Sequence, residues 1–230
     1  MSFFVTLSED GYLLTNAGYT ALVVVILLLF LLGVFLFGSK KKKTTAKQMA
    51  FSAMAIALAT VTSIFKLFDM PMGGSVTLCS MLFICLIGYW YGLGSGLTCA
   101  IAYGFLQLLI DPYIISLPQM LTDYVLAFGA LGLAGLFFNK KYGLLKGYIV
   151  AVLGRYFFTF LSGWIFFGTY APANFPNAVV YSLAYNGCYI GIEAAITIAI
   201  ISIPQVTKAL NMVKQYATDS QDTVSAKTLS

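Results

Sequence analysis

The sequence contains no histidine, and only 9% of its 230 residues are charged, compared with about 25% in an average soluble domain. So few charges exclude a soluble chain of this length, because hydrophobic residues make up 60% of the sequence and too little polar surface is available to cover them. A bilayer removes that need, and a helix crosses it with about 20 mainly apolar residues. The composition therefore predicts an all-α integral membrane protein that forms one membrane domain with short connections.

Motifs of catalysis and metal binding are missing as well. The sequence has no G-x-x-x-x-G-K-[ST] phosphate loop, no H-E-x-x-H and no G-x-S-x-G, so it excludes ATP hydrolysis by the phosphate-loop route and we expect no enzyme. Without histidine or C-x-x-C spacing, the cysteines form no recognisable metal site. We interpret them as small packing residues and expect neither a metal nor a cofactor: Cys79, Cys85, Cys99 and Cys188.

Seven apolar runs predict seven membrane-spanning helices. The first, residues 20–37, belongs to an N-terminal segment, residues 1–45, that ends in a lysine-rich cytoplasmic loop. The other six form a substrate-binding membrane domain over residues 46–206, with helices expected at residues 46–65, 77–90, 93–110, 119–138, 146–167 and 178–203. Residues 207–230 have too little apolar content to fold alone, so we expect a disordered polar tail.

The basic residues predict the topology. With seven crossings, every basic residue except Lys66 and Arg155 lies on one side of the membrane, as the positive-inside rule expects of cytoplasmic loops. Glu9 and Asp10 precede the first run and lysines follow it, which is the reverse of a signal peptide. We expect a multi-pass cell-membrane protein with its N-terminus outside and its C-terminus in the cytoplasm. The same pattern argues against a nucleic-acid partner, despite a net charge of +5.

Three charged residues, Asp123, Arg155 and Glu193, fall within the predicted spans. A charge at the bilayer centre costs at least ~2.5–3.5 kcal/mol on insertion scales, so such a residue normally faces a partner or a cavity. We interpret Arg155 as a structural ion-pair partner of Asp123 or Glu193, with a direct ligand role as the alternative. Because there are two acids and only one base, one carboxylate is left without a basic partner. This favours a role for the acids in a small-molecule site.

Helical spacing places polar residues on shared faces. Residues three, four or seven apart lie on one side of a helix, which groups Arg155, Thr159, Gly163 and Phe167 on one predicted span and Asn186, Tyr189 and Glu193 on the last one. These faces are expected to line one cavity between the helices. Tyr181, Tyr185 and Phe167 lie beside them, where an aromatic face suits a flat ring or a cation.

Five runs carry a resemblance to a known family: MPMGGSVTL from Met70, DYVLAFGALGLAGLF from Asp123, RYFFTFLSG from Arg155, FGTYAP from Phe167 and YSLAYN from Tyr181. In this order, over residues 47–204, they resemble the thiamine-specific S component of energy-coupling factor (ECF) transporters. Such S components have six helices, so the helix before Lys40 is an addition.

The resemblance implies a substrate-binding subunit without ATPase activity. It would bind thiamine from outside, dock on a T subunit that carries two cytoplasmic ATPases, and tilt to release the vitamin inward. In this family, small residues on the first core helix contact the T subunit, and the corresponding residues here are Ala46, Ala50, Ala53 and Ala57. Their spacing also suits ordinary packing of membrane helices.

The resemblance also implies roles for individual residues. Asp123 would engage the cationic thiazolium, because opposite charges attract strongly at low dielectric. Positions that hydrogen-bond or stack on the ligand match Tyr124, Tyr181 and Asn186, while Phe167 would sandwich a ring, Tyr103 would form a further wall, and Gly163 would let the ring approach the backbone. Glu193 is the remaining site candidate.

Two positions depart from the family pattern. Thr159 stands where the R-x-x-x-H pattern has a histidine, and Phe167 stands where some members have tryptophan. Threonine is shorter than histidine and never cationic, so the contact to the pyrimidine ring is affected. Two alternatives therefore stay open: the same transporter class with a thiamine precursor or another vitamin as ligand, and a membrane scaffold in which the charges serve only packing.

Overall fold

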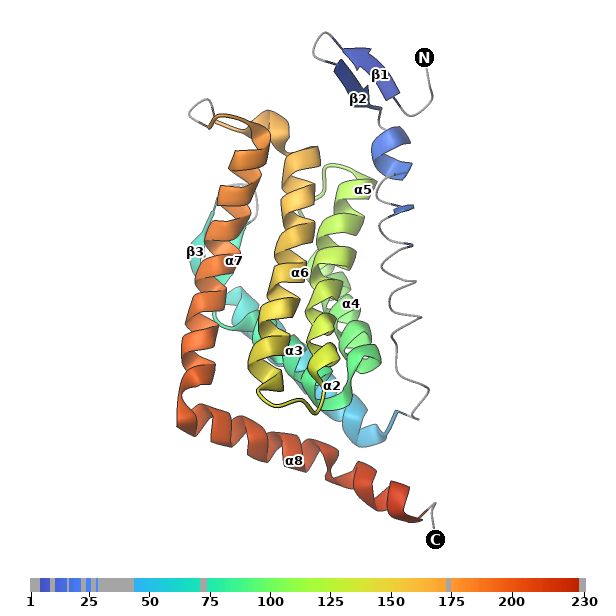
Figure 1. Ribbon diagram of the computed structural model, residues 1–230, viewed down its shortest axis with the longest axis vertical. Coiled ribbons are helices and arrows are strands. Elements are labelled where there is room, and N and C mark those ends of the chain that lie inside the picture. The colour runs from blue at the N-terminus through green and yellow to red at the C-terminus, as the bar shows by residue number, and fades with distance from the viewer. Residues whose placement is uncertain are drawn as a thin grey trace.

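The computed structural model describes residues 5–8, 11–15, 17–21, 24, 25, 28, 44–70, 74–172 and 175–227. Between residues 44 and 203 they form an upright helical bundle (Figure 1). Its helices are α2 (Ala46–Ile64), α3 (Ser80–Tyr91), α4 (Leu93–Ile110), a continuous stretch of α5 (Leu117–Met120), the π-helix η2 (Leu121–Ala127) and the 3-10 helix η3 (Ala130–Phe137), then α6 (Gly143–Phe166) and α7 (Ala178–Ser202). A single 3-10 turn, η4 (Gly168–Tyr170), follows α6.

Five helices in the described part of the chain are long and apolar enough to cross a membrane, and α3 is a shorter apolar helix. The predicted all-α membrane bundle is confirmed. The count of seven spans stays a prediction, because most of the first span lies outside the described residues. Of the run 20–37, residues 20, 21, 24, 25 and 28 are described, and they are helical.

Two hairpins were not predicted from the sequence. Near the N-terminus, β1 (Val5–Ser8) pairs antiparallel with β2 (Gly11–Leu14). Between α2 and α3, β3 (Lys66–Asp69) pairs antiparallel with β4 (Ser75–Thr77). Because β4 belongs to this second hairpin, the helix expected over residues 77–90 starts only at Ser80, after Cys79 adopts a left-handed conformation with φ 59°.

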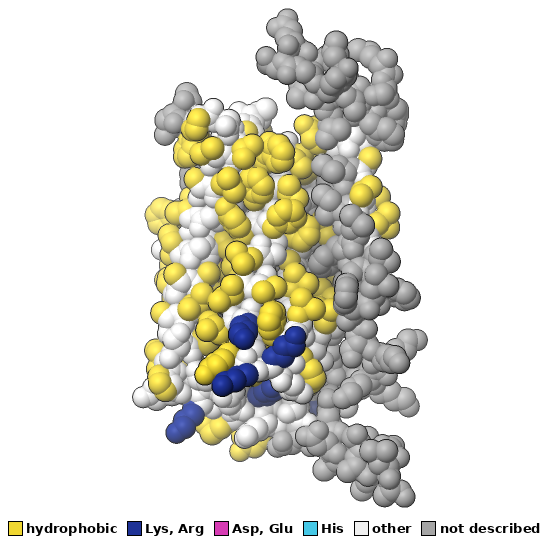
Figure 2. Space-filling view, viewed as in Figure 1, with side chains coloured by type: hydrophobic (Ala, Val, Ile, Leu, Met, Phe, Trp, Pro, Cys, Tyr) yellow, Lys and Arg dark blue, Asp and Glu magenta, His cyan; other side chains and the backbone are white. Residues whose placement is uncertain are grey.

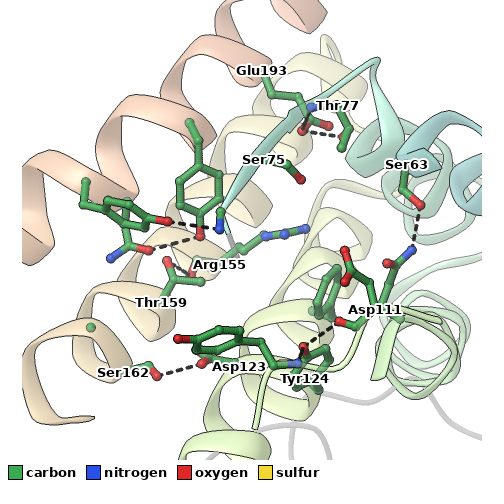
Figure 3. Close-up of a pocket in the computed structure, with 18 of the residues that line it drawn as sticks. Ser63, Ser75, Thr77, Asp111, Asp123, Tyr124, Arg155, Thr159, Ser162 and Glu193 are labelled. Atoms are coloured by element: carbon green, nitrogen blue, oxygen red, sulfur yellow. Dashed lines mark hydrogen bonds between the residues drawn. The ribbon is translucent and has the colours of Figure 1, made fainter. Parts of the chain in front are cut away.

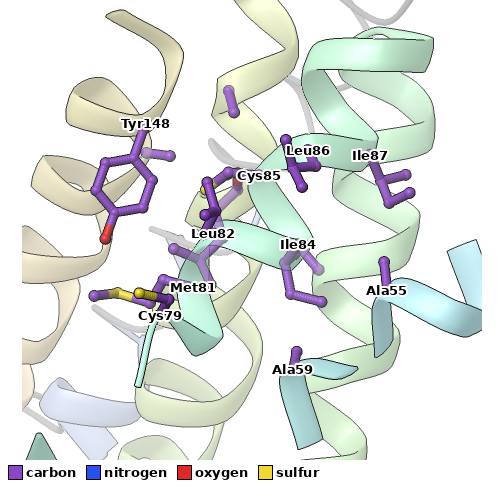
Figure 4. Packing of buried hydrophobic residues seen from close by; sticks show 14 of the residues in the cluster. Ala55, Ala59, Cys79, Met81, Leu82, Ile84, Cys85, Leu86, Ile87 and Tyr148 are labelled. Atoms are coloured by element: carbon purple, nitrogen blue, oxygen red, sulfur yellow. The ribbon is translucent and has the colours of Figure 1, made fainter. Parts of the chain in front are cut away.

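Glycines let α3, α4 and η3 pack backbone against backbone. A Cβ atom at Gly132 would lie 2.5 Å from backbone atoms of Leu97 on α4, and one at Gly88 would lie 2.8 Å from the backbone nitrogen of Gly135. Figure 4 shows buried apolar side chains of α3 between Ala55 and Ala59 of α2 on one side and Tyr148 of α6 on the other. These close contacts hold α3, α4 and η3 against one another.

Residues 204–227 form a helix, where the sequence predicts a disordered tail over residues 207–230. α8 (Pro204–Lys227) lies across one end of the bundle (Figure 1). Ala217 is only 1% exposed, Tyr91 donates a 3.1 Å hydrogen bond to its carbonyl, and Lys214 Nζ lies 4.2 Å from the centre of the Tyr89 ring. The expectation of disorder considered the segment alone, whereas these contacts join Lys214 and Ala217 of α8 to α3.

The outer surface is that of a membrane-embedded bundle. On the face shown in Figure 2, hydrophobic side chains cover most of the described surface, and lysine and arginine side chains gather towards the end where α8 lies. An apolar exterior of this extent requires lipid around it.

Candidate functional site

A cavity of about 170 Å³ lies at the end of the bundle opposite α8. The ends of α2, α4 and α6, the beginnings of η2 and α7, and the β3–β4 hairpin surround it. Every residue predicted to bind substrate lines this cavity: Tyr103, Asp123, Tyr124, Thr159, Gly163, Phe167, Tyr181, Asn186 and Glu193. Ala46, Ala50, Ala53 and Ala57 lie elsewhere, along an exposed strip of α2.

Asp123 is held in place by neutral donors. Gln119 Nε2 lies 2.6 Å from Asp123 Oδ2, and Ser162 Oγ donates to the same oxygen at 2.9 Å (Figure 3). Gln119 is itself fixed, because it donates to the carbonyl of Tyr113 and accepts a hydrogen bond from the backbone of Ile115. These donors orient the carboxylate without neutralising its charge.

The sequence analysis missed both donors. Gln119 precedes Asp123 by four residues, so helical spacing could have identified it. Ser162 directly precedes Gly163. The π-helical turn of η2 carries Asp123, and single π turns often occur at functional sites. A search for polar residues one turn before each intramembrane acid would have identified Gln119.

Arg155 does not form the predicted ion pair. Among the described residues, ion pairs join Lys66 to Asp69 at 3.3 Å and to Asp111 at 3.0 Å. The guanidinium carbon of Arg155 instead lies 4.1 Å from the centre of the Phe128 ring. Amide and hydroxyl groups bind Oδ2 of Asp123, and hydroxyl and backbone N–H groups bind both oxygens of Glu193, which sequence spacing could not reveal.

Glu193 is 4% exposed and joins α7 to the start of α3. Its carboxylate accepts hydrogen bonds from the Thr77 backbone (3.2 Å), the Thr77 hydroxyl (2.7 Å), the Ser80 hydroxyl (3.0 Å) and the Met81 backbone (3.3 Å). A negative charge is favourable at a helix N-terminus, where the backbone N–H groups lack partners. Glu193 lines the cavity, but its oxygens hold α3 and the hairpin in place.

Aromatic rings form much of the cavity wall. Tyr113 and Phe167 stack with centroids 5.8 Å apart and an angle of 27° between planes. On α7, the rings of Tyr181, Tyr185 and Tyr189 follow one another with centroids 5.8 Å apart at each step. A flat or cationic ligand can pack against such faces for ~0.5–2 kcal/mol per contact.

Tyr103 and Tyr124 have structural contacts. Tyr103 packs edge-on against Phe128 with centroids 5.4 Å apart and donates to the carbonyl of Ala59. The Tyr124 hydroxyl accepts from the Tyr113 backbone at 2.8 Å and donates to the carbonyl of Asp111 at 3.0 Å. Tyr103 thus joins α4 to α2, and Tyr124 joins η2 to the loop after α4. Both tyrosines hold the walls of the cavity in place.

Three more predicted residues lie on α6 and α7, which pack against each other at Gly163. Asn186 accepts a 3.0 Å hydrogen bond from the Tyr189 hydroxyl and donates to the carbonyl of Ser182. A Cβ atom at Gly163 would lie 2.9 Å from Asn186 Nδ2, so this glycine permits close helix packing. The Thr159 hydroxyl donates to backbone carbonyls of its own helix, at Arg155 and Tyr156.

At the rim, the hairpin is joined to α4. The hydrogen bond from Lys66 to Asp111 raises the pKa of Lys66, and Gln107 donates a 2.9 Å hydrogen bond to Ser63. Across the described residues, no group of three or more cysteine, aspartate or glutamate side chains could hold a metal ion. The cavity is suited to an organic molecule with an aromatic or cationic part.

This fold defines a multi-pass membrane protein with a cavity lined by polar and aromatic side chains. The model of a family described as thiamine transporter protein (Thia_YuaJ) matches residues 49–213, so the chain belongs to the thiamine transporter family. This is a family of transporters and not of enzymes. The resemblance of the sequence to thiamine-specific S components is thereby confirmed.

Individual relatives agree with this assignment. The thiamine transporter ThiT of Bacillus subtilis (strain 168) is 36% identical over 152 residues, which cover 60% of this chain and 77% of that protein. ThiT of Lacticaseibacillus paracasei (strain ATCC 334) is 30% identical over 98 residues, which cover 37% and 48%. The solved structure of ThiT from Listeria monocytogenes has the same fold, with a TM-score of 0.57, 21% identity, and 69% of this chain and 96% of that chain covered.

Proposed function

We propose that this chain is the S component of an ECF-type vitamin importer and that it binds thiamine. Membership of the thiamine transporter family supports this, as does a cavity at one end of the bundle that combines a carboxylate with aromatic walls. The chain binds the vitamin from outside the cell membrane, and seven crossings place its N-terminus outside and its C-terminus in the cytoplasm.

The arrangement around Asp123 carries the proposal. Its carboxylate lines the cavity and receives hydrogen bonds from Gln119 and Ser162, and among the described residues no lysine or arginine lies within ion-pair distance of it. The thiazolium ring of thiamine is permanently cationic, so this carboxylate can supply its counter-charge. Tyr124, Phe167, Tyr181 and Asn186 complete the contacts to the ligand.

Energy for transport comes from partner subunits in this proposal. The sequence has no phosphate loop, so a T subunit with two ATPases drives release into the cytoplasm. The T subunit docks on the exposed alanine strip of α2 at Ala46, Ala50, Ala53 and Ala57, because small side chains permit close contact between membrane helices.

Calorimetry on the detergent-solubilised full-length protein tests the proposal. We expect thiamine to bind with a dissociation constant well below 1 µM and a stoichiometry of one per chain. Absence of binding at micromolar thiamine would remove thiamine as the ligand.

A thiamine precursor or another vitamin is the second candidate ligand. The Thr159 position favours it, because the threonine hydroxyl donates to its own backbone and no histidine is available for the pyrimidine. A competition series with the isolated pyrimidine and thiazole halves of thiamine separates the two candidates, since at equal concentration the ligand with the lowest dissociation constant occupies most of the sites.

A further inference from the structure

The helix α8 carries two apolar faces, and one of them packs on the bundle. On that face, Ala217 is 1% exposed and Leu210 packs against the buried core. The second face, called here the outer stripe, consists of residues three or four positions apart in the helix: Ala209, Met212, Val213 and Tyr216. Met212 is 55% exposed and Tyr216 is 70% exposed, so the outer stripe is an apolar surface that the bundle does not cover.

The direction of α8 places the outer stripe at the level of the membrane surface. α8 lies across the end of the bundle (Figure 1), whereas the apolar helices of the bundle have the length to cross the bilayer. A helix with separate apolar and polar faces lies in the interface, with its apolar face at the boundary between headgroups and acyl chains. Exposed apolar side chains continue into it from α7, where Ile192 and Ile203 are each 45% exposed, and tyrosine is common at this depth.

The end of the bundle that carries α8 is basic. Residues 139–147 and 204–218 contain five lysines and no acidic residue: Lys140, Lys141, Lys146, Lys208 and Lys214. Lys214 Nζ lies 3.2 Å from Asn139 Oδ1, so α8 is held beside the turn that carries the first two of these lysines. The acidic residues of α8 come after this segment: Asp219 and Asp222. Lysines around an apolar stripe complement a membrane surface that contains anionic lipids.

We propose that α8 is an in-plane membrane helix that binds anionic phospholipids. Its outer stripe lies against the acyl chains next to the headgroups, and the lysines of α8 and of residues 139–147 bind the lipid phosphates. Lysine suits this position because its apolar stem can lie along the acyl chains while the ammonium reaches the headgroups. None of these lysines and none of the residues of the outer stripe lines the cavity, so the inference is independent of the ligand that the cavity binds.

Spin labels on α8 test where the outer stripe lies. The background variant is Cys188→Ser, which removes the exposed thiol and leaves three buried cysteines. Met212→Cys carries the label on the outer stripe, and Gln215→Cys is the matched control on an exposed polar face of the same helix. The full-length protein is reconstituted in vesicles of phosphatidylcholine and phosphatidylglycerol. We expect the ratio of accessibility to oxygen over accessibility to a water-soluble nickel complex to be at least threefold higher at position 212 than at position 215.

Equal ratios at the two positions would overturn the proposal. The vesicles contain no other protein, so an outer stripe that faces water in them would be a surface for a protein partner instead.

Lys208→Gln combined with Lys141→Gln tests the contact with lipid phosphates, since both lysines are exposed. Native mass spectrometry of the solubilised full-length protein compares binding of phosphatidylglycerol and phosphatidylcholine. We expect the wild type to bind phosphatidylglycerol at least fivefold more tightly, and the double variant to reduce this ratio at least twofold. Lys208→Arg combined with Lys141→Arg keeps both charges and should keep the ratio.

A wild type without preference for phosphatidylglycerol would overturn the lipid contact, and so would an unchanged ratio in the glutamine variant. Thiamine binding should be the same in the wild type and in both double variants, because neither lysine lines the cavity. Failure of the wild type to bind thiamine would bear on the proposed function alone.

Discussion

The side-chain amide of Gln119 lies 2.6 Å from Asp123 Oδ2 and also bonds the carbonyl of Tyr113. Gln119 is 1% exposed, so the protein fixes the direction of its amide. Because its donor points at the carboxylate, the acid is oriented before a ligand arrives. Preorganisation of this kind improves affinity by lowering the cost of ordering the site on binding.

Gln119→Leu should therefore weaken thiamine binding about three- to tenfold, since one net hydrogen bond contributes about 1 kcal/mol. Gln48→Leu is the matched control, because Gln48 is also buried but bonds Ser95 outside the cavity. Calorimetry on both variants checks the prediction. Equal affinity in Gln119→Leu and the wild type would show that the amide does not position Asp123.

Asp123→Asn removes the charge and keeps the shape of the side chain. We expect thiamine affinity to fall at least tenfold, which corresponds to about 1.4 kcal/mol, because the cationic ring loses its counter-charge. Asp69→Asn removes an exposed acid that does not line the cavity and serves as the control. An unchanged dissociation constant in Asp123→Asn would exclude this residue from the site.

Thr159→Val tests whether the threonine hydroxyl contacts the ligand. That hydroxyl already donates to the carbonyls of Arg155 and Tyr156, and valine has nearly the same shape. We expect the thiamine dissociation constant to change less than threefold. A loss of tenfold or more in the same calorimetric assay would place the hydroxyl in direct contact with the vitamin.

Glu193→Gln separates stability from binding. An amide oxygen accepts fewer hydrogen bonds than a carboxylate, so donors at the start of α3 lose their partner, at a cost of about 1–3 kcal/mol. We expect a clear fall in the melting temperature of the solubilised protein, with a much smaller loss of thiamine affinity than in Asp123→Asn. If both variants only lower the melting temperature and the wild type binds no ligand, a membrane scaffold is the better description.

Gly132→Ala tests the packing of η3 against α4. Its added methyl would lie 2.5 Å from the backbone of Leu97, and overpacking of this kind typically costs 1–3 kcal/mol. Gly94→Ala on α4 adds the same methyl with no atom within 4 Å and is the control. The yield of monodisperse protein and the melting temperature should fall for Gly132→Ala alone.

Much of the fold follows from local sequence signals. The span expected over residues 93–110 coincides with α4 (Leu93–Ile110), because an apolar run of helical length lies between Gly92, whose φ is 90°, and Asp111-Pro112. The face of α6 was found from its spacing by four, which brings Thr159, Gly163 and Phe167 to the cavity. Such periodic patterns depend on residues close in sequence.

The remaining features depend on contacts between distant segments. Glu193 caps the start of α3 and bonds Thr77, a residue more than a hundred positions before it in the chain. The order of α8 depends on Tyr89 and Tyr91 of α3. Arg155 was assigned an ion pair because spacing cannot show which donors have already satisfied an acid.

The π turn at Leu121–Ala127 separates two requirements along one span. A regular α-helix turns about 100° per residue, so a wider turn shifts the angular position of every residue that follows it. Asp123 faces the cavity in this turn, while Gly132 meets α4 beyond it. The π turn therefore helps to set the angle between the residues that face the cavity and the glycines that pack against α4.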